Sequence, residues 1–81
     1  MSGADQVQRG IRTRRALLAV ARLCLERRCP LPTHVAIARI VGIDASQIAN
    51  HWSRMEEAGQ VERVRVGTKH GVRYRVRSVG A

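Results

Sequence analysis

Residues 37–66 decide the fold, and they read IARIVGIDASQIANHWSRMEEAGQVERVRV. In this stretch, and just before it, apolar residues recur three and four positions apart, which is the period of an amphipathic helix. Gly42 can adopt the left-handed conformation that ends one helix, and Asp44 can cap the next. The stretch therefore predicts a helix over 34–41, a short turn, and a second helix over 45–58.

Both helices carry further signals at their ends. Thr33 is a favourable N-cap for the first helix, and Gln47 forms with Asp44 a pair similar to a capping box. Gly59 supplies a left-handed residue after the second helix. Trp52 lies in phase with the apolar stripe of the second helix, so we expect it in the core rather than on a base-stacking surface.

Upstream, apolar residues recur at helical spacing over 11–28. Pro30 and Pro32 end this first helix, because proline lacks a backbone donor and forces the residue before it into an extended conformation. Residues 1–10 are polar and predict a flexible N-terminal arm with some helix from Asp5 onward.

Downstream, the hydrophobic period changes to two on both sides of residues 67–71, which predicts a β-hairpin. If a five-residue loop closes symmetrically, Arg65 lies opposite Arg73 and Arg63 lies opposite Arg75. Together with Arg77, these four arginines then form one outward face of the hairpin. Like charges directly opposite one another cost roughly 0.2 to 1 kcal/mol per pair, and a polyanion would relieve that repulsion.

Composition favours a binding protein over an enzyme. The chain has 81 residues, which allows one domain with a small core and little apolar material for a substrate pocket. Fifteen Lys and Arg residues against six Asp and Glu give a formal net charge of +9, and every cation except Lys69 is an arginine. Arginine pairs bidentately with planar acceptors and phosphates, so nucleic acid is the leading partner class, ahead of an acidic protein or an anionic membrane.

The sequence gives little support for metal binding, catalysis or a membrane span. Cys24 and Cys29 lack the spacing of a metal site, so we expect Cys24 as a buried thiol and predict no metal and no cofactor. The carboxylates are scattered, which predicts no catalytic residue. The apolar run from Ala16 is interrupted by Arg22, is too short for a bilayer and has no cleavage site after it. We therefore expect a cytoplasmic protein, associated with the nucleoid.

The central stretch resembles the winged helix-turn-helix domains of bacterial and phage transcription regulators. The positions that carry the resemblance are Ala38, Gly42, Ile43, Ile48 and the exit Met55-Glu56-Glu57-Ala58-Gly59, followed by a strand pair that would be the wing. The resemblance covers 11–78, leaves 79–81 as a tail, and implies an α+β fold of three helices with a C-terminal two-stranded hairpin. In that family the helix over 45–58 would enter the major groove while the wing lies along the backbone.

The expected function is sequence-specific binding of double-stranded DNA by a transcriptional regulator. The candidates for reading base edges are Ser46, Gln47, Asn50, His51 and Arg54. The candidates for backbone contact are Thr33, Arg63, Arg65, Thr68, Lys69, His70, Arg73, Arg75 and Arg77. Two alternatives stay open: a protein-interaction module, such as a phage-type inhibitor or assembly factor that presents its arginines to an acidic partner, and RNA binding.

The helix over 11–28 also predicts a homodimer. Its apolar stripe is wider than a three-helix core needs, and surplus apolar surface favours a partner. A single recognition helix reads few base pairs, so pairing two half-sites would increase specificity.

Overall fold

A computed structural model describes the backbone of residues 3–69 and 71–80, with side chains from residue 7 onward except that of Thr68. Three helices are followed by a two-stranded antiparallel sheet: α1 (Gly3–Arg27), α2 (His34–Val41), α3 (Ala45–Glu57), β1 (Val61–Thr68) and β2 (Gly71–Val79). This order confirms the predicted α+β fold with a C-terminal hairpin.

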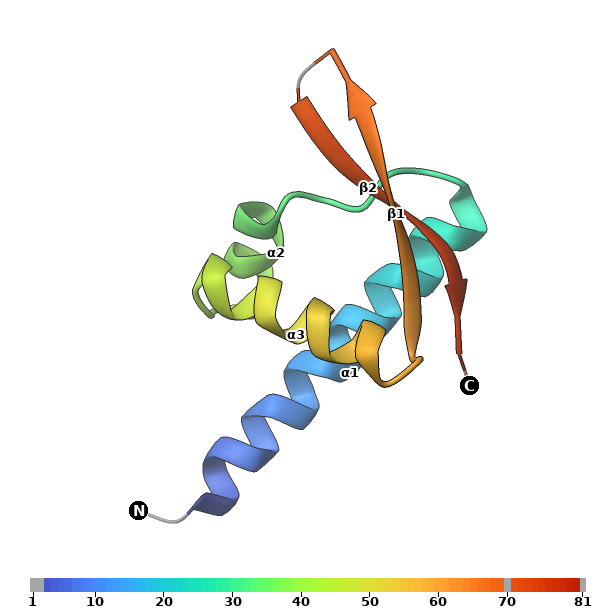
Figure 1. The fold of residues 1–81 in the computed structure, drawn as a ribbon. Helices are drawn as coiled ribbons and strands as arrows, with labels where there is room; N and C mark the ends of the chain where they lie inside the picture. The colour runs from blue at the N-terminus through green and yellow to red at the C-terminus, as the bar shows by residue number, and fades with distance from the viewer. Residues whose placement is uncertain (1–2, 70, 81) are drawn as a thin grey trace.

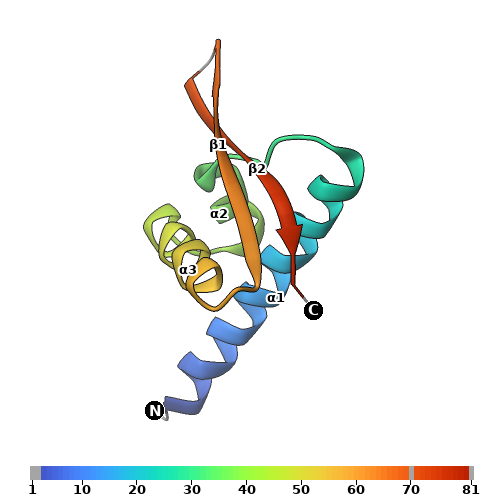
Figure 2. The ribbon, with the colours of Figure 1, turned by 45° about the vertical axis from the view of Figure 1, so that its right-hand side comes forward.

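The molecule is elongated, about 45 Å by 27 Å by 20 Å. The hairpin projects at one end, the N-terminal half of α1 projects at the other, and α3 lies between them (Figures 1 and 2). The polar surface of α3 is therefore flanked by two projecting elements.

Helix α1 begins earlier than the sequence predicts. It starts at Gly3 rather than at residue 11, so residues 3–10 continue the helix instead of forming a separate arm. Extending an existing helix adds one hydrogen bond for each residue fixed, whereas starting a new helix is unfavourable. Although α1 has 25 residues, no helix in the part of the chain that the structure describes is both long and apolar enough to cross a membrane.

The core lies where the C-terminal half of α1, α3 and the base of the hairpin meet. Trp52 is fully buried at its centre, as predicted. Cys24 is also buried as predicted, and burial together with the neighbouring Cys29 raises the pKa of its thiol. The other buried apolar residues are Leu17, Ala21, Leu31, Ile37, Ile48, Met55, Val61 and Val76.

The turn between α2 and α3 follows the local signals in part. The Thr33 hydroxyl accepts a hydrogen bond from the backbone N–H of Ala36 at 3.2 Å, and Gly42 takes a left-handed conformation with φ 85°. Both were predicted. Asp44 is the N-cap residue of α3, as predicted, but its side chain forms no cap hydrogen bond. Its backbone carbonyl accepts from the N–H groups of Gln47 at 3.0 Å and Ile48 at 3.2 Å.

The register of the hairpin differs from the prediction by one residue. β1 continues to Thr68 and β2 starts at Gly71, so the connection is shorter than the five-residue loop expected. Arg65 therefore pairs with Tyr74 instead of with Arg73. Side chains alternate across a strand, so a slip of one residue moves every side chain of one strand to the other face.

Because of this register, the arginines of the hairpin do not share one outward face. Arg63 pairs with Val76, which is buried, so the side chains of both residues lie on the face of the hairpin that packs on the core. Arg73 and Arg75 pair with Val66 and Val64 on the opposite face. The predicted set of mutually repelling arginines was therefore wrong.

Candidate nucleic-acid interface

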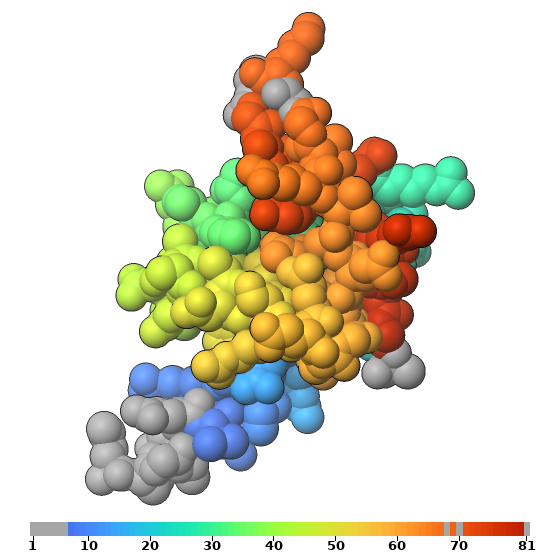
Figure 3. Space-filling model, in the orientation of Figure 1, coloured from blue at the N-terminus to red at the C-terminus, as the bar shows by residue number. Residues whose placement is uncertain are grey.

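The polar residues of α3 fall on two distinct faces. At about 100° per residue, the buried stripe of Ile48, Trp52 and Met55 defines the inward direction. Ser46, Asn50, Ser53 and Glu57 lie directly opposite that stripe and are exposed. Figure 3 shows α3, in yellow, at the surface between the hairpin, in orange and red, and the blue part of α1 from residue 7 onward.

The remaining predicted readout residues lie on the side of α3 that faces α1. Gln47, His51 and Arg54 line a groove of about 690 Å³ together with Arg9 and Arg14 from the N-terminal half of α1. No acidic residue is among the described residues that line this groove. The five predicted readout residues therefore divide into a fully outward pair, Ser46 and Asn50, and three residues in a basic groove.

Two polar atoms in this groove are buried without a partner. Neither Arg14 Nε nor His51 Nδ1 has a hydrogen-bond partner within the part of the chain that the structure describes. Burial lowers the pKa of His51 below its usual value, and the charges of Arg14 and Arg54 lower it further. His51 is therefore neutral at pH 7, and arginine supplies the positive charge of the groove.

On the other side of α3, Arg63 anchors the hairpin instead of facing solvent. Its side chain is only 8% exposed, and its guanidinium lies 5.2 Å from the ring centroid of Trp52 and 4.3 Å from that of Tyr74. Arg63 Nε donates to Glu56 Oε1 at 2.8 Å, and Nη2 donates to the same oxygen. This network fixes the angle between the hairpin and α3, so the role of Arg63 is structural.

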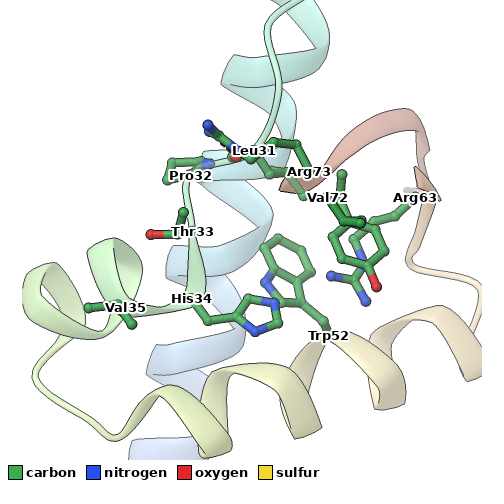
Figure 4. Close-up of a pocket in the computed structure, with 10 residues that line it drawn as sticks. Leu31, Pro32, Thr33, His34, Val35, Trp52, Arg63, Val72 and Arg73 are labelled. Carbon is green, nitrogen blue, oxygen red and sulfur yellow. Dashed lines mark hydrogen bonds between the residues drawn. The ribbon is translucent and has the colours of Figure 1, made fainter. Parts of the chain in front are cut away.

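A pocket of about 180 Å³ lies between the base of the hairpin and the start of α2. Figure 4 shows Arg63 reaching across it toward Trp52, with His34 below. Burial and the charge of Arg63 lower the pKa of His34. The Arg63 guanidinium is stable in this partly apolar site because the rings of Trp52 and Tyr74 contact its faces. The carboxylate of Glu56 balances its charge.

Removing that carboxylate should destabilise the fold. In a Glu56→Ala variant the buried guanidinium of Arg63 loses its only ion-pair partner in the described residues, so we expect a loss of about 1.5 to 3 kcal/mol in the free energy of unfolding. Glu57→Ala is the matched control, because Glu57 is exposed and forms no ion pair with any described residue, and it should change stability by less than about 0.5 kcal/mol. Urea denaturation followed by circular dichroism measures both. Equal free energies of unfolding for the two variants would show that the ion pair between Arg63 and Glu56 does not stabilise the fold.

The other predicted backbone contacts are distributed unevenly. Arg73 and Arg75 donate to the carbonyl oxygens of Leu31 at 2.8 Å and Arg28 at 3.1 Å, so both bind the link between α1 and α2. Arg77 lies 3.4 Å from a carboxylate oxygen of Glu62 at the surface. The exposed cations of the hairpin that form none of these contacts are Arg65 and Lys69.

The three remaining residues predicted to contact the DNA backbone are Thr33, Thr68 and His70. Thr33 is exposed, but its hydroxyl caps α2. The side chain of Thr68 and all of His70 lie outside the described residues.

Arg9 and Arg14 line the groove, although neither was among the residues predicted to bind DNA. Residues 1–10 were expected to be a loose arm, and only the extension of α1 to Gly3 holds Arg9 beside α3. The signal available in the sequence was the density of arginines at 9, 12, 14 and 15. Comparisons with models of protein families, with curated proteins and with solved structures gave no match for this chain.

Proposed function

We propose that this chain is a sequence-specific double-stranded DNA-binding protein of the winged helix-turn-helix class and acts as a transcriptional regulator. In this role α3 lies in the major groove, and its outward face meets the base edges. The protein works by binding alone, without a cofactor or a catalytic step. Its place of action is the nucleoid in the cytoplasm.

The observation that carries this proposal is the outward face of α3. Ser46 and Asn50 are exposed opposite the core stripe, and their side chains form no hydrogen bond within the described part of the chain. An asparagine amide can pair bidentately with adenine, and a serine hydroxyl can pair with any base. The major groove is wide enough to admit a helix with such a face.

The charge around α3 supports a polyanionic partner. Arg54 on α3 and the arginines of α1 lie on one flank, while Arg65 and Lys69 project on the hairpin at the other. Glu57 is the exposed acidic residue at the C-terminal end of the outward face. Contact with DNA is therefore confined to the first two and a half turns of α3.

Binding of the full chain to three fluorescent probes of equal length tests this function: a mixed-sequence duplex, one of its single strands, and a structured RNA. We expect the duplex to bind most tightly, with an affinity that falls steeply as salt rises. Selection from a random duplex pool should then enrich one site. Preference for RNA or for the single strand would overturn the proposal. Failure to bind any probe would also overturn it and favour an acidic protein partner.

We also propose that the regulator is a homodimer paired through α1. Leu23 is 46% exposed, although it belongs to the apolar residues of that helix. Sedimentation equilibrium at micromolar concentration should give about twice the 9.0 kDa mass of one chain. Leu23→Glu should return the species to the mass of one chain, and a monomeric parent protein would contradict the dimer.

A further inference from the structure

The N-terminal half of α1 is an arm that packs beside α3 instead of into the core. Its residues Arg9, Arg12 and Arg15 are exposed, and Arg14 is partly buried. Of these four, Arg9 and Arg14 line the groove shared with α3, whereas Arg15 does not. The cations that line the groove are therefore Arg9 and Arg14 of α1 together with Arg54 of α3.

This arrangement is unfavourable for the protein alone. Arg9, Arg14 and Arg54 line one groove with no acidic residue among its described lining, and like charges in close proximity repel one another. Arg14 Nε and His51 Nδ1 are also buried without a hydrogen-bond partner among the described residues. A bound anion with acceptor oxygens would relieve the repulsion and pair with the exposed guanidinium groups of Arg9 and Arg54.

The position of the groove indicates which anion it takes. A helix of about 10 to 12 Å diameter fills a major groove that is about 12 Å wide, so an element packed against the side of that helix lies at the level of the phosphates. The groove, at about 690 Å³, is larger than one phosphate group and lies between the N-terminal half of α1 and the side of α3. The groove therefore has room for the phosphate groups of a DNA backbone.

We propose that the groove between the N-terminal half of α1 and α3 holds the phosphate backbone of one DNA strand, with Arg9, Arg14 and Arg54 as its contacts. This proposal rests on the proposed DNA-binding function and adds where the backbone is held. Gln47 and His51 contact the same strand. The groove therefore adds a backbone contact to those that Arg65 and Lys69 of the hairpin can make, whereas Arg63, Arg73 and Arg75 donate hydrogen bonds within the protein.

The salt dependence of binding to a random-sequence duplex tests the groove. Each phosphate contact adds about 0.9 to the slope of log affinity against log salt concentration. Neutralising the arm with Arg9→Gln and Arg14→Gln together should lower that slope by about 2 and weaken binding on the order of 10- to 100-fold at 0.1 M salt. Arg9→Gln alone changes an exposed side chain and should lower the slope by about 1.

The matched control neutralises Arg15 and Arg22, which lie on the same helix, are exposed, and do not line the groove. This double variant has the same net charge as the first and should lower the slope by less than about 0.5. Equal slopes for the two double variants would overturn the groove, as would an unchanged slope for the Arg9 and Arg14 variant. In both cases the parent protein still binds duplex, so its DNA-binding function stands. Failure of the parent protein to bind duplex would overturn both proposals.

Discussion

Trp52→Ala should remove a large share of the stability of the protein. Trp52 is 0% exposed, and it belongs to a buried core that draws residues from all three helices and the hairpin. Truncating a buried tryptophan to alanine costs about 3 to 5 kcal/mol. A domain of this length has a total stability of about 4 to 12 kcal/mol, since stability averages roughly 0.05 to 0.15 kcal/mol per residue. Urea denaturation followed by far-ultraviolet circular dichroism measures the loss.

Ile40→Ala provides the control for that variant. Ile40 is 79% exposed on α2, so removing its side chain should change the free energy of unfolding by less than about 0.5 kcal/mol. Trp52→Ala should also weaken the hairpin anchor, because the ring of Trp52 contacts the guanidinium of Arg63. A Trp52→Ala protein within about 1 kcal/mol of the parent would show that Trp52 is not the centre of the core.

The helices and the turn could be predicted because their signals are local. Capping by Thr33, the left-handed conformation of Gly42 and the burial of Trp52 each depend on residues within one or two helical turns. Asp44 shows the limit of such reasoning, since its backbone satisfies the first turn of α3 without its side chain.

The register of the hairpin could not be predicted from the pattern of charges. Alternation fixes which residues of one strand share a face, but it does not fix the register, and a slip of one residue moves every side chain of the partner strand to the other face. Gly71 has a φ of 112°, which permits a tight connection and moves Arg65 from Arg73 to Tyr74. The predicted pairing of the arginines was wrong because it required a symmetric five-residue loop over 67–71, and the actual connection is shorter.

Burial of Arg63 was also beyond sequence reasoning. Charged residues in a strand are ordinarily exposed, and a buried guanidinium is tolerated only when charge and aromatic partners surround it. Glu56 lies seven residues away on another element, and Tyr74 lies on the opposite strand, so only the folded chain brings the three together. The same holds for the groove, which depends on where α1 crosses α3.

Replacement of Asn50 by alanine should have the largest effect on sequence specificity. Asn50 lies opposite the core stripe, where α3 would face the base edges, and a bidentate amide contributes about 1 to 3 kcal/mol of discrimination. Affinity for a selected site should therefore fall about 5- to 150-fold, since 1.4 kcal/mol corresponds to a factor of ten. Affinity for random duplex should fall less than twofold. Fluorescence anisotropy on both duplexes gives the two numbers.

Gln47→Ala is the matched truncation, because Gln47 carries the same amide one turn earlier on α3 but lies in the groove with α1. If that groove holds a phosphate backbone, loss of the Gln47 side chain should weaken binding to both duplexes by the same factor, since phosphates carry no sequence information. The two variants thus separate the faces of α3: one residue reads sequence and the other fixes position. Equal losses on both duplexes for Asn50→Ala would reduce the outward face to a non-specific contact and place sequence readout elsewhere on the protein.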